Sequence, residues 1–263
     1  MREPVRRIRN EFELQDLVDS LGLDAQLVER DFALMTVAAG LVKEFGSALC
    51  FKGGFVLRHV YGHERFSKDI DATRINPPKS KLNSMEVAEA IKNAGVRNLL
   101  ALNPGVPATD SRRSLDFDNI GYIGPIGRGS VSVEVSYRED VVEPPDIVVI
   151  GEPYYEPFEV PVLQLDEIVA EKLRALAQRV RPTDLSDIAM VLTREAIDSQ
   201  RVRRLAAKKF ELVKQGSHRR RIEDNIAAMA PEYNAAIKAV APDAPDFEES
   251  RKLVIRHLPK LLP

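Results

Sequence analysis

Residues 66–72 read Phe66-Ser67-Lys68-Asp69-Ile70-Asp71-Ala72, and this stretch decides the fold. It reads as a loop that enters a β-strand. Successive side chains on a strand point to opposite faces, so Asp69 and Asp71 should share one face while Ile70 packs behind them. Two carboxylates held this close repel each other unless a cation lies between them, and Mg²⁺ prefers such oxygen ligands together with substrate phosphates. The pair predicts a magnesium site, with an exposed acidic loop as the alternative.

A glycine pair precedes this segment. Ala48–Phe51 is an apolar run that indicates a buried strand, and Gly53 and Gly54 separate it from a short helix expected over Phe55–Tyr61. Glycines at such a junction let backbone amides approach a triphosphate closely, at a helix N-terminus that favours anions. The glycine pair therefore predicts a phosphate-facing turn, with a plain tight turn as the alternative.

A hairpin is expected downstream, with strands over Ser114–Ile123 and Ser130–Tyr137 and a turn over 124–129. The second strand alternates valine with polar residues, so Glu134 should lie on its polar face. A third carboxylate on a neighbouring strand is what a metal site for phosphoryl transfer needs. Glu134 is therefore a candidate metal ligand, with an ordinary solvent-facing strand residue as the alternative.

From Leu165 onward the sequence reads as helices. This order predicts an α/β (α+β) domain with N-terminal helices over residues 1–162 and a helical domain over residues 163–263. Lys172 lies at the margin of an apolar helical stripe, from which it could reach a triphosphate across a domain cleft and balance the leaving pyrophosphate. Asp184 and Asp187 open the next helix, where the helix dipole favours carboxylates, so a structural role is the plain expectation for both.

Composition limits the class of protein. With 44% hydrophobic and 30% charged residues, the chain reads as a globular protein. Its apolar runs are far shorter than the roughly 20 residues that a bilayer requires, and the basic N-terminus lacks the apolar stretch of a secretory signal, so we expect a cytoplasmic location and no membrane partner. The lone Cys50 excludes an intramolecular disulfide, and the four histidines lack zinc-ligand spacing.

The net charge of −2 conceals two basic segments. One is the N-terminal arm, Arg2–Arg9, and the other runs from Arg201 to Arg221. Such segments can hold the phosphate backbone of an RNA, in a contact that weakens with salt. Solvated helix faces are the alternative interpretation.

Four segments together resemble the AbiEii/AbiGii toxin family of nucleotidyltransferases. They are Phe51–Arg58, Arg65–Asp71, Glu171–Arg179 and Thr183–Ile188, in the order that the family shows. The resemblance implies a DNA polymerase β-like nucleotidyltransferase domain with a mixed sheet, followed by a C-terminal helical domain. It also implies the toxin half of a bacterial toxin–antitoxin or abortive-infection system, with a cognate antitoxin as partner.

Residue by residue, the resemblance implies that Asp69 and Asp71 bind metal. Glu134 aligns with a third ligand mainly by its strand position. Gly53 and Gly54 would form the phosphate-facing turn.

Four more positions match the family. Arg58 and Ser67 could contact the nucleotide, and Lys172 would contact the triphosphate. Asp187 matches the last catalytic acidic residue of the family, which replaces the structural expectation for it. Phe55 stands where the family often has threonine or serine, so the nucleotide contacts near the glycine pair stay open.

Residues and resemblance together predict NMP transfer from an NTP to an RNA 3′ end, with Mg²⁺-dependent release of pyrophosphate. The MenT-type members of the family point to tRNA as the acceptor. One alternative is transfer of NMP or phosphate to a protein or a small molecule. Another is a non-enzymatic nucleotide-binding module, although a mere binder has no use for the like charges of Asp69 and Asp71.

Overall fold

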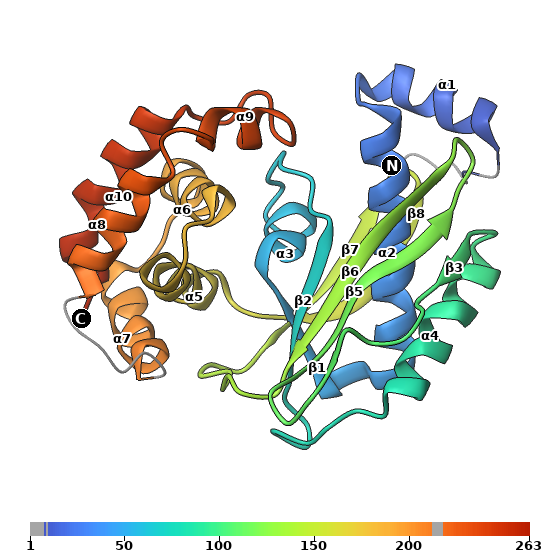
Figure 1. The fold of residues 1–263 in the computed structure, drawn as a ribbon, viewed down its shortest axis with the longest axis horizontal. Helices are drawn as coiled ribbons and strands as arrows, with labels where there is room; N and C mark the ends of the chain where they lie inside the picture. The colour runs from blue at the N-terminus through green and yellow to red at the C-terminus, as the bar shows by residue number, and fades with distance from the viewer. Residues whose placement is uncertain (1–7, 9, 212–217) are drawn as a thin grey trace. The chain divides into compact units, whose positions relative to one another are not determined.

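The computed structural model describes residue 8, residues 10–211 and residues 218–263 (Figure 1). The expected basic arm Arg2–Arg9 lies almost entirely outside the described residues. Contacts divide the chain into two compact units. The sheet unit contains the described residues up to Gly62, together with 66–141 and 145–162. The helical unit contains 163–263 and two short segments, 63–65 and 142–144.

The described strands form one eight-stranded sheet in the order β3-β5-β6-β2-β1-β8-β7, with β4 beside β5. Their bounds are β1 Leu49–Lys52, β2 Asp69–Arg74, β3 Ala101–Asn103, β4 Thr109–Asp110, β5 Ser114–Ile123, β6 Arg128–Ser136, β7 Asp146–Glu152 and β8 Tyr155–Val162. The pairs β2–β6 and β1–β8 are parallel, and the other pairs are antiparallel. The predicted mixed sheet and mixed α/β class are therefore confirmed.

The helices of the sheet unit are α1 Glu11–Leu21, α2 Ala25–Phe45, α3 Gly53–His59 and α4 Ser84–Arg97, with a 3₁₀ turn over Gly46–Ala48. Helix α2 is the central support, because it packs against α4, β6 and β8. Asp24 caps its first turn by accepting a hydrogen bond from the backbone N–H of Leu27. The alternating valines of β6 are all buried, which leaves its polar residues on the opposite face of the sheet.

The helical unit consists of α5 Leu165–Gln178, α6 Pro182–Arg194, α7 Ser199–Phe210, α8 His218–Ala228, α9 Tyr233–Lys238 and α10 Phe247–Leu261. Helix α5 packs against α6, α7 and α8, and α10 packs against the same three helices. Helix α6 begins with Pro182, whose missing N–H would have no partner at that position. Asp246 and Glu249 form a capping box at the start of α10.

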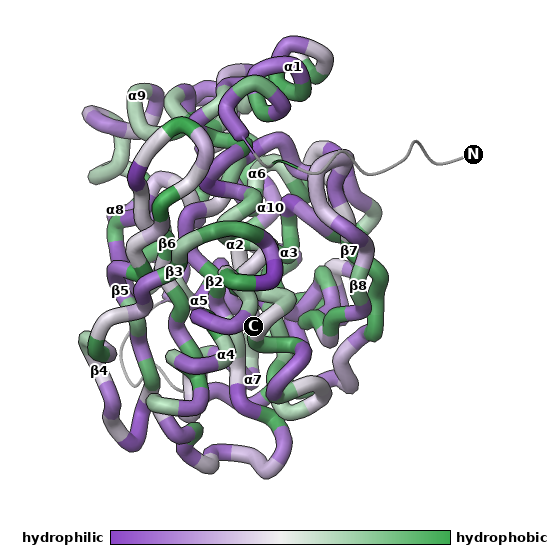
Figure 2. The backbone as a smooth tube through the Cα atoms, turned by 90° about the vertical axis from the view of Figure 1, so that its right-hand side faces the viewer, coloured by the Kyte–Doolittle hydropathy of each residue, from purple (hydrophilic) through white to green (hydrophobic). Residues whose placement is uncertain are grey.

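Short hydrophilic and hydrophobic stretches are intermixed along the backbone, as Figure 2 shows. Among the described residues, no helix is both long and apolar enough to cross a bilayer.

Two local features differ from the sequence-based expectations. Helix α3 begins at Gly53, not at Phe55, so both glycines belong to its first turn. Strand β8 was not expected, because Pro157 and Pro161 interrupt the pattern of a strand. It forms nonetheless, since it pairs with β7 along its length and meets β1 at Val162.

Candidate active site

Strand β2 carries the two aspartates of the decisive segment. Ile70 is fully buried, whereas Asp69 and Asp71 are partly accessible. The alternation follows from the side-chain period of two in a strand, so both carboxylates lie on one face of the sheet.

Three carboxylates stand next to one another across three strands. Asp71 on β2 lies opposite Glu134 on β6, and Glu134 lies opposite Asp116 on β5. Directly opposed residues share a face of the sheet and have Cβ atoms about 5 Å apart. We call Asp71, Glu134 and Asp116 the acidic row. Like charges in opposed positions destabilise a sheet, so the row favours a function that uses them.

The acidic row changes the acidity of its central member. Loss of hydration beside the neighbouring strands raises the pKa of Glu134, although its side chain still reaches solvent. The negative charges of Asp71 and Asp116 raise that pKa further, and the positive charge of Lys52 opposes them. A cation among these carboxylates would remove the repulsion.

A lysine ends the row on the other side. Lys52, the last residue of β1, lies opposite Asp71. Its ammonium group forms a buried ion pair with Glu139, which follows β6. The cation is therefore shared between Glu139 and the acidic row, and it compensates only part of the negative charge.

Gly53 lies close to the carboxylate of Asp71, a member of the acidic row. Its φ is +70°, a conformation that side chains with a Cβ rarely adopt. A Cβ at this position would lie 2.5 Å from Asp71 Oδ2. Glycine is therefore required both by the backbone and by the close approach of Asp71. Gly54, the next residue of α3, is also buried.

Two of the predicted nucleotide-contacting residues already have partners within the sheet unit. The Ser67 hydroxyl donates to the backbone carbonyl of Asp69 at 3.0 Å, which fixes the entry into β2. Arg58 Nε donates to Asp31 Oδ2 at 3.3 Å, and its guanidinium lies 3.5 Å from the centre of the Phe66 ring.

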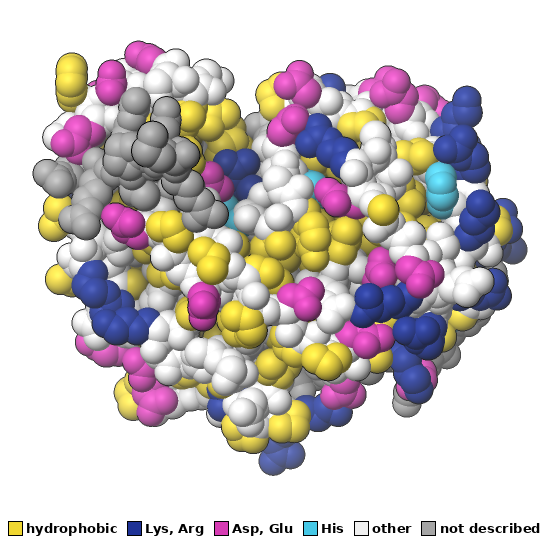
Figure 3. Space-filling model, turned by 180° about the vertical axis from the view of Figure 1, so that it is seen from behind, with side chains coloured by type: hydrophobic (Ala, Val, Ile, Leu, Met, Phe, Trp, Pro, Cys, Tyr) yellow, Lys and Arg dark blue, Asp and Glu magenta, His cyan; other side chains and the backbone are white. Residues whose placement is uncertain are grey.

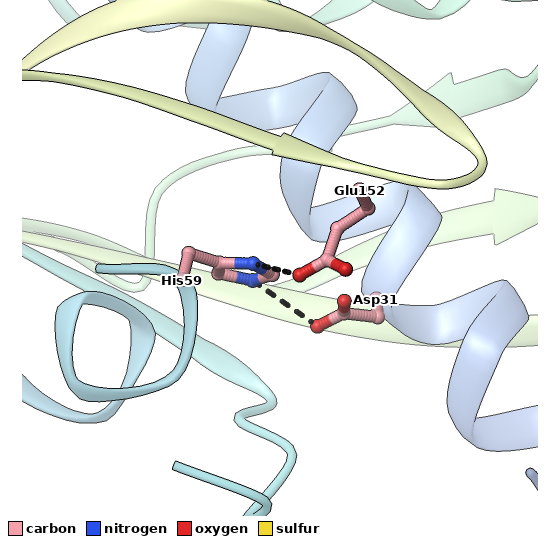
Figure 4. Close-up of side chains that lie close together, drawn as sticks. All are labelled: Asp31, His59 and Glu152. Carbon is pink, nitrogen blue, oxygen red and sulfur yellow. Dashed lines mark hydrogen bonds and ion pairs between the residues drawn. The ribbon is translucent and has the colours of Figure 1, made fainter. Parts of the chain in front are cut away.

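Next to Arg58 lies a cluster of Asp31, His59 and Glu152, of which only Glu152 has a partly exposed side chain (Figure 4). His59 Nδ1 is 2.7 Å from Glu152 Oε1, and His59 Nε2 is 3.3 Å from Asp31 Oδ1. The Tyr154 hydroxyl donates to Asp31 Oδ2 at 2.6 Å. Among the described residues, this is the group of three potential ligand atoms that lie within 4.8 Å of one another. The cluster of Asp31, His59 and Glu152 thus connects helix α2, helix α3 and the end of strand β7.

Burial alone lowers the pKa of His59, but the carboxylates of Asp31 and Glu152 outweigh it, and the net shift is upward. The pKa of Asp31 moves down, because His59 and Arg58 overcome the effect of burial. An imidazolium between two carboxylates explains the cluster without a metal ion.

The helical unit carries a second network of charges. Lys172 on α5 forms ion pairs with Asp184 at 2.8 Å and with Asp187 at 2.9 Å, both on α6. Arg65 makes a bidentate pair with Asp187, at 2.7 and 3.0 Å. Arg179 pairs with Asp184 at 2.8 Å. Lys172, Arg65 and Arg179 thus surround the two buried carboxylates.

Burial and pairing act in opposite directions in this network. Burial alone would raise the pKa values of Asp184 and Asp187, but the neighbouring cations outweigh it and both lie below their usual range. Burial alone would lower the pKa of Lys172, but the two carboxylates outweigh it and the net shift is upward. All three groups are therefore charged near neutral pH.

The basic run from Arg201 is largely paired within the helical unit. Lys209 is 2% exposed and forms ion pairs with Glu167 and Glu171. Arg201 and Arg204 pair with Glu143. On the face shown in Figure 3, Lys and Arg side chains lie beside Asp and Glu side chains. Lys209 is therefore taken up inside the helical unit, whereas the side chains of Arg204 and Lys208 remain largely exposed.

Asp116 was missed by reasoning from the sequence. Its signal was nevertheless present, because Leu115-Asp116-Phe117 repeats the apolar–acidic–apolar pattern around Glu134. Asp116 accepts a hydrogen bond from the Ser114 hydroxyl at 3.0 Å, while its Oδ1 is buried without a partner.

The residues of the acidic row suit magnesium by their chemistry. The donors are carboxylate oxygens, which Mg²⁺ prefers. Burial is the largest cause of the raised pKa of Glu134, and the charges of Asp71 and Asp116 add to it, so a cation at this face would relieve their repulsion. Asp69 lies on the same face of β2 and could join them.

Comparison with solved structures identifies the fold. MenT4, a nucleotidyltransferase toxin from Mycobacterium tuberculosis, is 21% identical, with a TM-score of 0.69, over 94% of this chain and 89% of that one. A putative nucleotidyltransferase from H. pylori is 17% identical, with a TM-score of 0.64, over 91% and 96% of the two chains. JHP933 from Helicobacter pylori is 17% identical, with a TM-score of 0.61, over 91% and 93%.

No curated protein matches the sequence significantly. The profile of the nucleotidyl transferase AbiEii toxin family, of type IV toxin–antitoxin systems, matches residues 39–254, which is most of the chain. The expectation of an enzyme with an NTP substrate is thereby confirmed, and the toxin class implies a cognate antitoxin. This chain belongs to the AbiEii family of nucleotidyltransferase toxins.

Proposed function

We propose that this toxin transfers a nucleoside monophosphate from an NTP to the 3′ end of an RNA, with tRNA as the acceptor, and releases pyrophosphate. The observation that carries the proposal is the acidic row, in which Asp71 and Glu134 are opposed on adjacent parallel strands. Asp69 adds a carboxylate on the same face of β2. In the reaction, the RNA 3′-hydroxyl gives up its proton to solvent and its oxygen bonds to the α-phosphorus, while the bond to the pyrophosphate oxygen breaks.

Asp69, Asp71 and Glu134 would hold Mg²⁺ in this proposal. Bound Mg²⁺ would neutralise triphosphate charge and assist the displacement at phosphorus. Gly53 and Gly54 would face the phosphates, because the absence of a Cβ at Gly53 leaves the approach to Asp71 open. The carboxylates thus fix the position of the reacting phosphate.

Lys172 would contact the triphosphate, and Asp187 would position Lys172. The two ion pairs of Lys172 support this role, because Asp184 and Asp187 hold its ammonium group in place and keep it protonated. Ser67 and Arg58 would contact the nucleotide. In the free protein they hold the start of β2 and helix α3.

The test uses each α-³²P-labelled NTP with Mg²⁺ and total RNA. We expect label to appear on RNA of tRNA size, and Asp69→Asn and Asp71→Asn to lower the rate by about a hundredfold or more. Asp118→Asn is the matched control, because Asp118 lies exposed on β5 outside the acidic row. Equal transfer by wild type and Asp69→Asn would contradict the proposal, and label on protein alone would favour the alternative acceptor.

A further inference from the structure

A polar cavity of about 420 Å³ lies between helix α2 and the β5–β6 hairpin. The helix lines it with Gln26, Glu29 and Arg30, and the hairpin contributes Tyr122 and residues 126–130. Its volume falls in the range of about 300–1,000 Å³ that small-ligand sites occupy.

This cavity is separate from the acidic row. Ser130 lies four residues before Glu134 on β6, roughly 13 Å along the strand. Tyr122 is paired with Gly129, whose position on β6 is in phase with the buried valines and out of phase with Glu134. The cavity therefore belongs to the α2 side of the sheet, and the acidic row belongs to the other side.

The cavity holds a cation whose hydrogen-bonding capacity is unmet. Arg30 Nε and Nη2 are buried and have no acceptor among the described residues. A buried donor without an acceptor is unfavourable, and a guanidinium cannot lose its charge to relieve this. Arg128 is exposed and also lines the cavity.

The hairpin is shaped to form the wall of this cavity. A Cβ at Gly129 would collide with the Tyr122 hydroxyl, and one at Gly124 would collide with the carboxyl group of Glu29. Glu29 accepts a hydrogen bond from the backbone N–H of Ile126 at 2.8 Å. Burial raises the pKa of Glu29, and this hydrogen bond opposes that shift.

A second, more open cavity of about 510 Å³ adjoins the first. The two share Tyr122 and residues 128–130, and the second extends to Asn103 and Asn119. Asn103 is in register with Gly121 and Ser130, which are out of phase with the buried valines of β6, so the second cavity extends onto the face opposite α2.

We propose that the Arg30–Arg128 cavity binds the phosphate group of a nucleotide, either free or within an RNA strand. Phosphate oxygens accept from guanidinium groups in the strongest class of hydrogen bond found in proteins. Arg30 turns toward the cavity and gains the acceptors that it lacks. The site lies away from the reacting groups, so it binds a second ligand or a distant part of the acceptor.

The test is calorimetric titration of the Asp69→Asn protein in EDTA at low salt. The probes are inorganic phosphate, AMP and a single-stranded RNA of about 12 nucleotides. We expect at least one probe to bind saturably, and Arg30→Gln and Arg128→Gln each to weaken that binding about tenfold or more. Arg113→Gln should leave it unchanged, because Arg113 is exposed and lies outside both cavities.

RNA binding that is tenfold tighter than AMP binding would assign the site to a strand, and equal binding would assign it to a free nucleotide. No saturable binding of any probe, or unchanged affinity in Arg128→Gln, overturns the proposal. Arg128 is exposed, so its substitution does not threaten the fold. The titration does not measure transfer, so its failure is distinguishable from failure of the proposed reaction.

Discussion

Gly53 at the start of α3 lies so close to Asp71 on β2 that a Cβ at Gly53 would be 2.5 Å from Asp71 Oδ2. We expect Gly53→Ala to displace the Asp71 carboxylate and to lower nucleotidyl transfer about tenfold or more. The substitution also forces alanine into a conformation with φ of +70°, which costs about 1–2 kcal/mol. Transfer rates and chemical denaturation measure the two effects separately.

Gly22→Ala is the matched control for that substitution. Gly22 has φ of +65°, and a Cβ there would meet nothing within 4 Å. It should therefore lose about 1–2 kcal/mol of stability and keep full activity. Equal activity of the two variants would show that the contact with Asp71 is unimportant.

Lys172→Met should lower the free energy of unfolding by about 3–5 kcal/mol, because Asp184 and Asp187 are buried and lose a shared cation. It should also weaken NTP binding in the fraction that remains folded, if Lys172 contacts the triphosphate. Denaturant titration and nucleotide titration at low temperature measure these two quantities.

Arg179→Gln provides the comparison for Lys172→Met, because it removes a cation from the same Asp184. The Arg179 side chain is 49% exposed, so we expect a loss of about 1 kcal/mol or less and little change in NTP affinity. Equal loss of NTP affinity in both variants would argue that Lys172 acts only through the network.

His59 should make stability depend on pH. Its pKa is raised above the usual 6.5 in the folded protein, where it faces Asp31, Glu152, Arg58 and Tyr154. Folding thus favours the protonated ring, and this stabilisation is complete below about pH 6.5 and lost as the pH rises through the folded-state value. Denaturation midpoints between about pH 6 and 9 should fall in the wild type.

His59→Gln should remove most of that dependence. His257→Gln should preserve it, since the His257 ring contacts the backbone carbonyl of Leu253. Because burial lowers the pKa of His63, which changes stability with pH in the opposite direction, the decisive comparison is with the variant. The same pH dependence in wild type and His59→Gln would contradict the assignment of a buried imidazolium.

Lys209 should contribute to stability, not to RNA contact. Lys209→Met removes the cation that pairs with Glu167 and Glu171, and we expect a loss of about 3–5 kcal/mol in denaturant titration. Lys208→Met changes the neighbouring residue, whose pair with Glu211 is exposed, and should cost about 1 kcal/mol or less. Similar effects of the two substitutions would be incompatible with the different burial of the two lysines.

Local pattern was sufficient for much of the fold. The alternation in Ser130–Tyr137 predicted β6, and the pattern after Leu165 predicted a helical region, which the structure shows as α5 to α10. These elements depend on the spacing of apolar and polar residues within a short stretch of chain, and that spacing is visible in the sequence. Strand β8 escaped prediction, because its prolines argue against a strand and only its pairing with β7 and β1 overrides them.

The sequence by itself determined that Asp69 and Asp71 share a face, since that follows from the period of a strand. The sequence also indicated the AbiEii family, through segments spread along the chain. Only the tertiary structure decided that Asp71, Glu134 and Asp116 stand side by side, because strand order and register depend on pairings between residues far apart in the sequence. For the same reason, only the structure showed Lys172 between two buried aspartates and Lys209 between two glutamates. The sequence shows where a charged residue stands in the chain, but not which residue its side chain pairs with.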